Sequence, residues 1–510
     1  MNYNSLIYGK NDLERICSID IKDDCVFIYT EDPDGTVHEI VKSHKYWVLC
    51  SYKIDETWVK MNGDLYYQWG KQFSTYKEYR DFTQNNLMIR THFFQVYNPI
   101  EALMIKDGYT YFKGMKTPKE VSTLSFDIET TSLNPEDDNA KVLLISNTFR
   151  VNGIIQKQLF SYDNYPTQRK MIQDWANWVR EKDPSILLGH NINHFDLPYL
   201  DTIIRKEKGR LLLGRDKSQL DISDYESKFR VDGSRDLHYH KCKIFGREIV
   251  DTMFLAIRYD IGRKYQSYGL KSIIKDEGLE KKDRTFYDTN KIRFNYEKPD
   301  EWEKIKEYCE DDSLDALALF DLMSPSYFIL ANSIPKSFQG ILESASGSQI
   351  NSMMLRNYIQ EVHSIPQASE PEKFEGAISL AIPGIYKNVL SLDVASLYPS
   401  IMLEHSIFPK KKDPKGYLRE ILEFFTKQRL EAKKIFKETN DSYYDYLQGT
   451  AKIFINSMYG ALGAPGLQFN GPREAAKVTE LGRSILKKAI EIMTNMNYTD
   501  WERENIKEVA

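Results

Sequence analysis

The tightest constraint on this chain is a pair of acids inside an apolar run. In STLSFDIETTS, Asp127 and Glu129 are two positions apart among alternating apolar residues, which predicts a β-strand. Successive side chains of a strand point to opposite faces, so these two carboxylates leave the same face. They repel each other unless a cation lies between them. A half-exposed strand with polar residues turned to solvent would also explain this pair. Only further acids that lie near it can distinguish a metal site from such a strand.

Further acids follow at spacings that favour a metal site. Asn191 and Asp196 occur in N-x-x-x-F-D, and Tyr308 and Asp312 occur in Y-x-x-x-D, a helical spacing that places the phenol beside the carboxylate. With the strand pair this makes four acids, enough to hold two divalent ions about 4 Å apart. One ion would activate a water and the other would stabilise the leaving oxygen of a phosphodiester, while Tyr308 orients the water.

The length and composition of the chain indicate which broad class of protein it belongs to. With 510 residues, 41% hydrophobic and 28% charged, the chain is typical of a soluble globular protein with roughly three or four domains. No apolar run approaches the roughly 18 residues that suggest a membrane span, and the first residues lack the layout of a signal peptide. We therefore expect a cytoplasmic location and no membrane partner. The five cysteines form no C-x-x-C pair, which argues against a zinc ribbon or a disulfide framework.

The charge distribution is uneven. The net charge of -5 and the pI near 6.1 argue, taken alone, against a nucleic-acid partner. Between Lys410 and Glu438, however, ten Lys or Arg stand against five Asp or Glu. This basic segment is either a solvated helix face or a surface for phosphates, and only a motif can decide between the two.

The pattern of apolar residues changes along the chain. Alternating runs over the first 115 or so residues predict a mainly β region with hairpins. From Val121, strand-like runs such as KVLLISNTF and IIQKQLFSY and the amphipathic helix MIQDWANWVREKDP predict an α/β unit. After Ser324 come a helical stretch, short β runs from Phe374 through SLDVASLYPSIM, and then long helices. We therefore expect a multidomain protein of α/β and α+β class.

Two sets of motifs resemble those of one enzyme family. The acids and their neighbours, in this order, resemble the three exonuclease motifs of the proofreading domain in family B DNA polymerases, over about residues 121 to 322. D-x-x-S-L-Y-P-S, which begins at Asp393, resembles motif A of the same family, and K-x-x-x-N-S-x-Y-G, which begins at Lys452, resembles motif B. The resemblance implies a mainly β N-terminal domain, a ribonuclease H-like 3′→5′ exonuclease domain, a partial palm and helical fingers.

The resemblance assigns roles to the first set of motifs. It implies two Mg²⁺ or Mn²⁺ ions at each active site, and Tyr308 as a catalytic residue beside the acids. The implied metal ligands of the exonuclease site are Asp127, Glu129, Asp196 and Asp312. The residues implied to contact a single-stranded 3′ end are Thr130, Asn191 and Phe195. A stacked base contributes about 1 to 3 kcal/mol whatever its identity, which suits Phe195. The alternative for Phe195 is a place in the core.

The resemblance also assigns roles to the second set. Asp393, at the end of a predicted strand, would hold the metal ions of the polymerase site, with Val394 as a further ligand. The turn after it offers backbone N–H groups to a triphosphate, and Tyr398 would exclude a 2′-hydroxyl. The implied nucleotide-binding residues are Ser396, Leu397, Tyr398, Arg429, Lys433, Lys452 and Asn456. The implied DNA-binding residues are Gly376, Tyr459 and Gly460.

Two of these assignments depend on local pattern. Lys452, Asn456 and Tyr459 follow each other at i, i+4 and i+7, so they share one face of a helix. Gly376 lies in FEGA, which departs from the Y-x-G-G-type segment of the family because Phe replaces Tyr and Ala replaces Gly.

The second metal carboxylate of the polymerase site is expected in motif C, a D-T-D-S hairpin, and neither this motif nor a thumb precedes Ala510. We therefore expect the N-terminal part of a split family B DNA polymerase with proofreading activity. INSMYGALG is close to phage replicative polymerases, which would place the protein in a host cytoplasm. The alternatives are an exonuclease with a non-catalytic palm and a non-catalytic DNA-binding subunit of a replisome.

The same resemblance predicts partners and domains. The expected partners are primer-template DNA, a single-stranded 3′ end, deoxynucleoside triphosphates, a C-terminal fragment that carries motif C and the thumb, and a sliding clamp. The expected domains are an N-terminal domain over residues 1–118, the exonuclease over 119–325, a connecting segment that returns to the N-terminal domain and palm over 326–385, the first part of the palm over 386–408, the fingers over 409–464, and a truncated second part of the palm over 465–510.

Overall fold

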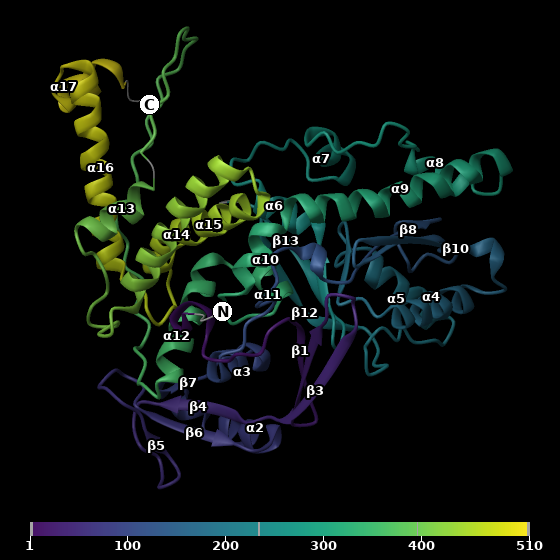
Figure 1. Ribbon diagram of the computed structural model, residues 1–510, viewed down its shortest axis with the longest axis horizontal. Coiled ribbons are helices and arrows are strands. Elements are labelled where there is room, and N and C mark those ends of the chain that lie inside the picture. Colours follow the sequence, from purple (N-terminus) through teal and green to yellow (C-terminus); the bar gives the residue numbers. More distant parts are fainter. Residues whose placement is uncertain (1–3, 233–234, 395, 507–510) are drawn as a thin grey trace.

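The computed structural model describes residues 4–232, 235–394 and 396–506. Figure 1 shows three regions: small antiparallel sheets near the N-terminus, a central sheet crossed by one long helix, and a helical part that leads to the C-terminus. This order of a β-rich region, an α/β unit and a helical region agrees with the fold class that the sequence predicts.

The N-terminal region contains two antiparallel sheets, as the alternating pattern predicts. The first sheet has the order β1-β2-β3 and the second has the order β5-β6-β4-β7. Their strands are β1 (Ile16–Lys22), β2 (Cys25–Glu31), β3 (Val37–Ser43), β4 (Tyr46–Cys50), β5 (Val59–Lys60), β6 (Trp69–Phe73) and β7 (Phe93–Phe94). The helices are α1 (Ser5–Tyr8), α2 (Tyr76–Asn85), the 3₁₀ helix η1 (Leu87–His92) and α3 (Pro99–Asp107).

The central region is a five-stranded mixed sheet with the order β10-β9-β8-β11-β14. β8 lies in its middle, antiparallel to β9 and parallel to β11. The strands are β8 (Thr123–Thr130), β9 (Val142–Val151), β10 (Ile154–Ser161), β11 (Ile186–Gly189) and β14 (Glu248–Asp251). A separate hairpin consists of β12 (Asp221–Arg230) and β13 (Asp236–Lys243).

Helices cover both faces of this sheet. α9 packs against β8 and β9, and α4 packs against β9 and β10 from the other side (Figure 1). β8 is therefore buried along most of its length. The helices of this region are the 3₁₀ helices η2 (Pro118–Glu120) and η3 (Tyr162–Asn164), α4 (Gln168–Lys182), α5 (Asp196–Lys206), α6 (Thr252–Tyr259), α7 (Leu270–Asp276), α8 (Thr289–Asn295) and α9 (Pro299–Met323).

The remaining described residues form helices and irregular segments. α14 and α15 are a long helical pair joined by a short turn, and the rings of Phe425 and Phe454 stack between them with centroids 4.0 Å apart. The helices are α10 (Pro325–Ala331), α11 (Phe338–Glu343), α12 (Ser346–Gln360), α13 (Leu397–Glu404), α14 (Tyr417–Thr439), α15 (Ser442–Gly463), α16 (Pro472–Thr494) and α17 (Tyr498–Asn505). In the described ranges, no single helix is long and apolar enough to cross a membrane. α9 and α10 reach that length and apolar composition only when they are taken together, and the two helices are bent by 61° relative to each other.

The strand predicted around SLDVASLY is wrong for the described residues, and so are the short β runs that precede it. Residues 366–394 form neither helix nor strand. Leu392 is 68% exposed and Val394 is 54% exposed. In Figure 1 the green trace of this segment projects beyond the packed helices. The alternating pattern indicates only a tendency, because a strand also needs a neighbouring strand to complete its hydrogen bonds, and the described residues supply none here.

A buried arginine connects the N-terminus to the helical region. Arg356 of α12 is fully buried, and its Nη1 donates to the carbonyl oxygen of Ser333 at 2.8 Å. Its Nη2 donates to the carbonyl oxygens of Leu6 at 3.1 Å and Ile7 at 2.7 Å. One guanidinium therefore satisfies backbone groups from two segments that are more than 300 positions apart in the sequence.

We predict that Arg356→Met lowers the free energy of unfolding by about 3 kcal/mol, because buried carbonyl groups lose a charged donor. Chemical denaturation measures this as a shift of the unfolding midpoint. The matched control is Arg419→Met, because Arg419 pairs with Glu423 on the exposed side of α14 and such pairs contribute about 0.3 to 0.5 kcal/mol. Equal losses in the two variants would contradict the role assigned to Arg356.

Candidate functional site

The central sheet positions the first two predicted acids. β8 pairs with β9 so that Asp127 lies opposite Ser146 and Glu129 lies opposite Leu144. Both acid side chains therefore leave the same face of the sheet, the face covered by α9. Asp127 is half-buried and Glu129 is only 8% exposed. A half-exposed strand with polar residues in solvent does not describe this pair.

Two helices bring the other predicted acids to the same place. Asp196 is the first residue of α5, and its Oδ1 accepts a hydrogen bond from the backbone N–H of Ile128 at 3.2 Å. Asp312 lies on α9 one turn after Tyr308, and both side chains are buried. The structure thus assembles the acids of all three motifs from β8, α5 and α9.

Burial and mutual repulsion raise the pKa values of these acids. Burial raises the pKa of Asp127 and of Glu129 well above the usual carboxyl range, and the neighbouring acids, Asp312 foremost, raise them further. Burial also raises the pKa of Asp196 to about 8. A divalent cation would oppose these shifts, because a nearby opposite charge favours the ionised form. The donor set fits Mg²⁺ or Mn²⁺, because carboxylate oxygens are the ligands that these ions prefer.

Two cations that the motifs do not indicate reach Asp312. Lys271 of α7 donates to the Tyr308 hydroxyl, and its Nζ is 3.9 Å from Asp312 Oδ2. Arg284 is buried; it donates to Asp312 Oδ1 and, at 2.7 Å, to Asp315 Oδ2. The Lys271 side chain is 37% exposed and can meet a ligand, whereas Arg284 is held between two acids. No sequence spacing links these two residues to α9, because the contacts are made across the fold.

The loop before α5 presents the residues predicted to contact a single strand. Asn191 has a left-handed backbone with φ 68°, and its N–H donates to Asp251 Oδ1 at 2.9 Å. Phe195 is half-buried just before α5, where its ring packs against the core of the central region, so both the stacking role and the core role stay predictions. Thr130 is half-buried at the end of β8. Asp251, which no motif indicates, fixes this loop, and its side chain also caps the N-terminus of α6.

Residues of the second motif set meet at the start of α13. Ser396 has a left-handed backbone with φ 53°, and Nη1 of Arg429 donates to its Oγ at 2.5 Å. The ring of Tyr398 lies 4.5 Å from the ring of Tyr459 on α15. A Cβ on Gly482 of α16 would come within 2.8 Å of the Tyr398 ring, so glycine is needed there for the ring to lie against α16. These contacts bring α14, α15 and α16 against the start of α13.

The helical pair exposes the other predicted residues of this set. Lys433 is exposed on α14, and Lys452 and Asn456 are exposed on α15. Tyr459 is half-buried and Gly460 is exposed further along the same helix. The predicted shared face of α15 is therefore confirmed. Leu397 is half-buried as the first residue of α13.

The remaining predicted residues, Asp393, Val394 and Gly376, lie before α13 in the segment 366–394, which contains neither helix nor strand. Asp393 and Val394 are exposed in the segment without a strand. Gly376 lies against α16, because Nη1 of Arg483 donates to the carbonyl oxygens of Glu375 and Gly376, both at 2.8 Å. FEGA is thus held on the helix that also contacts Tyr398.

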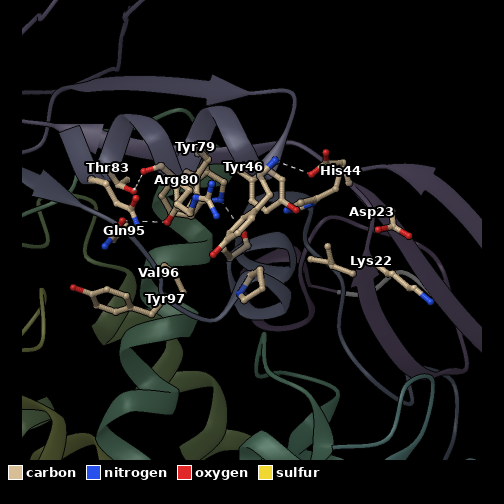
Figure 2. Close-up of a pocket in the computed structure, with 17 residues that line it drawn as sticks. Lys22, Asp23, His44, Tyr46, Tyr79, Arg80, Thr83, Gln95, Val96 and Tyr97 are labelled. Carbon is tan, nitrogen blue, oxygen red and sulfur yellow. Dashed lines mark hydrogen bonds between the residues drawn. The ribbon is translucent and has the colours of Figure 1, made fainter. Parts of the chain in front are cut away.

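A hollow of about 660 Å³ lies in the N-terminal region, outside every motif (Figure 2). Tyr46 of β4 and Tyr79 of α2 stack there with ring centroids 5.5 Å apart. Burial lowers the pKa of His44 in its wall to about 4, so this imidazole is neutral at pH 7. No sequence pattern predicts this hollow, because its wall comes from separate strands, a helix and loops.

Comparison with known proteins identifies two matching family models. The model for the exonuclease domain of DNA polymerase family B matches residues 96–273, and the model for DNA polymerase family B matches residues 406–509. Neither match includes Tyr308, Asp312 or Asp393, and the matches assign no role to any single residue, so the roles of all the site residues stay predictions.

Several curated relatives are named as DNA polymerases or as catalytic subunits of one. The catalytic subunit of DNA polymerase delta from Caenorhabditis elegans is 27% identical over 462 residues, which are 76% of this chain and 40% of that protein. The same subunit from Oryza sativa subsp. japonica is 29% identical over 71% of this chain and 38% of that protein. A DNA polymerase from Thermococcus gorgonarius is 24% identical over 74% of this chain and 51% of that protein. The chain thus spans about half the length of these relatives or less.

A solved structure shares the fold. The family B DNA polymerase from the hyperthermophilic archaeon Pyrobaculum calidifontis superposes with a TM-score of 0.75, over 94% of this chain and 72% of that chain. The sequence identity is 19%, so this likeness concerns the fold alone. It confirms the predicted fold class.

We predict that Mn²⁺ raises the thermal stability of the chain, because a bound cation relieves repulsion among the four acids. At a hundredfold excess over its Kd, a ligand of the folded state stabilises by about 2.7 kcal/mol. Asp127→Asn combined with Glu129→Gln should remove this gain and should stabilise the metal-free protein, since two buried charges are lost. Thermal unfolding with chelator and with Mn²⁺ measures both effects.

The control for this experiment is Glu303→Gln, which removes an exposed acid from α9. This variant should keep the full Mn²⁺ effect. An unchanged Mn²⁺ effect in the double variant would show that the cation binds elsewhere.

Proposed function

The chain belongs to the family B DNA polymerases, and we propose that its acid cluster hydrolyses single-stranded DNA from the 3′ end as a proofreading exonuclease. One observation carries this proposal: β8, α5 and α9, which are far apart in the sequence, place four acids and Tyr308 around one site. Buried like charges destabilise a fold unless a cation is bound. A purely structural role would therefore not favour this arrangement.

The acids, Tyr308 and Lys271 would have different roles in the reaction. Asp127, Glu129, Asp196 and Asp312 would hold two Mg²⁺ or Mn²⁺ ions, which when bound supply an activated water and stabilisation of the leaving oxygen. Tyr308 accepts a hydrogen bond from Lys271, so its own O–H is free to hold the attacking water. Lys271 keeps a positive charge at the edge of the site, where a phosphate oxygen can reach it.

The loop before α5 would hold the substrate. The half-exposed ring of Phe195 offers a stacking surface to the terminal base. Thr130 is the last residue of β8 and Asn191 lies in the loop after β11, and both would bind the nucleotide backbone. The rigid link between Asn191 and Asp251 supports this role, because it fixes the loop before any substrate binds.

We also propose that the helical part binds a deoxynucleoside triphosphate and takes part in its addition to a primer. Arg429 and Lys433 are one turn apart on α14, and Lys452 and Asn456 are one turn apart on α15. Ser396 and Leu397 would offer N–H groups at the start of α13, where helical N–H groups lack intrahelical partners. Tyr398 would lie under the sugar and exclude a 2′-hydroxyl. Gly376, Tyr459 and Gly460 would contact DNA.

Asp393 and Val394 would hold the metal ions of this second site. The expectation that a second polypeptide supplies the other carboxylates stays a prediction, and so do the phage type and the sliding clamp. The exposure of Asp393 in a segment without a strand favours one alternative, an exonuclease whose palm is non-catalytic. Primer extension that Asp393→Ala abolishes would count against that alternative.

For the exonuclease we predict that Asp127→Ala combined with Glu129→Ala slows degradation of a 3′-labelled single-stranded oligonucleotide by about 10³-fold or more. The reason is that metal-ion catalysis contributes several kcal/mol. Rates are measured with Mg²⁺ and with Mn²⁺, and Glu303→Gln serves as the control with unchanged rate. A purified chain that leaves the oligonucleotide intact over a wide range of metal concentrations would contradict the proposal.

For the helical surface we predict that Arg429→Met and Lys433→Met each weaken binding of a deoxynucleoside triphosphate by about tenfold, because each removes a charge-assisted hydrogen bond to phosphate. Titration with a fluorescent triphosphate measures the Kd. Lys427→Met is the control, since Lys427 is exposed on the same helix and pairs with Glu431. If all three variants weakened triphosphate binding equally, the effect would reflect general attraction between charges and would contradict the roles assigned to Arg429 and Lys433.

A further inference from the structure

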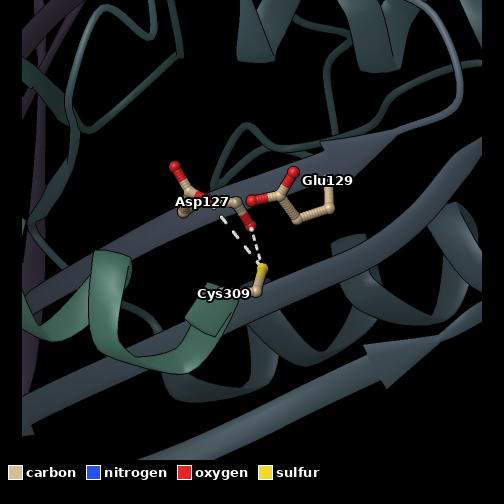
Figure 3. Close-up of side chains that lie close together, drawn as sticks. All are labelled: Asp127, Glu129 and Cys309. Atoms are coloured by element: carbon tan, nitrogen blue, oxygen red, sulfur yellow. Dashed lines mark hydrogen bonds between the residues drawn. The ribbon is translucent and has the colours of Figure 1, made fainter. Parts of the chain in front are cut away.

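A buried thiol lies beside the acids of β8, although no motif role includes it. Cys309 of α9 is fully buried, and its Sγ is 3.8 Å from Asp127 Oδ2. The ligand atoms of Asp127, Glu129 and Cys309 all lie within 4.8 Å of one another. Figure 3 shows the two carboxylates on one side of β8 and the thiol facing them from α9.

The residue Glu129 is 8% exposed, and its carboxylate has no hydrogen-bond partner among the residues that the structure describes. A buried ionisable group without a partner is rare, because its desolvation is not compensated. Glu129 lies within reach of the same space as Asp127 and Cys309 (Figure 3). This second observation points to a ligand between the three side chains.

Asp312 differs from the acids on β8 in its contacts. Its Oδ1 accepts from Arg284, and its Oδ2 faces Lys271 at 3.9 Å. Asp127 and Glu129 have no such cation in contact among the described residues. Within this site, the two acids on β8 and the thiol beside them are therefore the side chains that an added cation would contact.

The spacing suits a tetrahedral ion with mixed ligands. Zinc binds thiolate sulfur at about 2.3 Å and carboxylate oxygen at about 2.0 to 2.2 Å, so two such ligands on one tetrahedral ion lie about 3.5 Å apart. The separation of 3.8 Å between Cys309 Sγ and Asp127 Oδ2 is close to this value. A small rotation of Glu129 would bring in the third ligand, and water would take the fourth position.

We propose that Asp127, Glu129 and Cys309 form a site for a thiophilic divalent ion such as zinc, which excludes the oxygen-preferring ion of the exonuclease reaction. Thiolate selects zinc-like ions, whereas Mg²⁺ and Mn²⁺ prefer oxygen ligands. The binding site stands on the three side chains alone, and only the inhibitory consequence rests on the proposed exonuclease function. Zinc at this site is thus an inhibitor that Mg²⁺ displaces poorly.

The hydrogen bond of the thiol agrees with this role. Without a cation, Cys309 Sγ donates to Asp127 Oδ2. When a thiophilic ion binds, the thiol gives up its proton to solvent and coordinates the ion as the thiolate.

The first test is a titration of the whole chain with Cd²⁺, a spectroscopic substitute for zinc, followed by the sulfur-to-cadmium charge-transfer absorption. We expect one equivalent of Cd²⁺ to produce this band, and Cys309→Ser to abolish it. The matched control is Cys242→Ser, because Cys242 is equally buried and its Sγ faces only the backbone oxygens of Asn193 and His240. A band that persists in Cys309→Ser, or that is lost in Cys242→Ser instead, would overturn the proposal.

A second variant keeps the proposal testable if Cys309→Ser does not fold. Glu129→Gln keeps the thiol and the size of the side chain but removes one charged ligand. We expect it to weaken Cd²⁺ binding at least tenfold while the charge-transfer band survives at saturating Cd²⁺. Unchanged affinity would show that Glu129 is not a ligand and would overturn the proposed site.

The inhibitory consequence is tested separately from the site. Zinc should inhibit 3′→5′ degradation with Mg²⁺ in the native chain, and Cys309→Ser should require at least tenfold more zinc for half inhibition. Equal inhibition of both proteins would overturn the inhibitory consequence. A chain that shows the cadmium band but no degradation with any metal would leave the site standing and refute the proposed exonuclease instead.

Discussion

Repulsion among buried carboxylates is the constraint around which the central region is organised. β8 carries Asp127 and Glu129 into a space closed by α9, and α5 adds Asp196 from the side. Burial raises the pKa of all three carboxyl groups, and the nearby charge of Asp312 raises each of them further. The native fold therefore retains unfavourable repulsion among these carboxylates, and a bound divalent ion is the simplest group that can offset it.

The protein compensates only part of this charge with its own side chains. Lys271 and Arg284 come from the segment between α6 and α9, and both are directed to Asp312. Arg284 is fixed by Asp315, whereas Lys271 stays partly exposed. The acids on β8 receive no such partner among the described residues, and Cys309 lies beside them. Asp312 thus has two cations of the protein near it, whereas Asp127 and Glu129 have none in contact among the described residues.

The helical part depends on a different kind of interaction. Tyr398 packs between Tyr459 and the bare backbone at Gly482, and Arg429 reaches Ser396 from α14. Ring packing and one hydrogen bond from a guanidinium bring the helices α13 to α16 together here. The polar residues of α14 and α15 are then left on the solvent side, which is where a nucleotide can reach them.

Sequence alone determined the features that follow from local periodicity. The period of a strand puts Asp127 and Glu129 on one face, the period of a helix puts Lys452, Asn456 and Tyr459 on another, and the order of the motifs identifies the family. Tertiary structure alone decided which cations reach Asp312, that Cys309 faces the acids, and that the segment around Asp393 is no strand in the described residues. The reason is physical: side-chain direction is set within a few residues, whereas charge pairing and strand hydrogen bonds need partners that the fold supplies from distant parts of the chain.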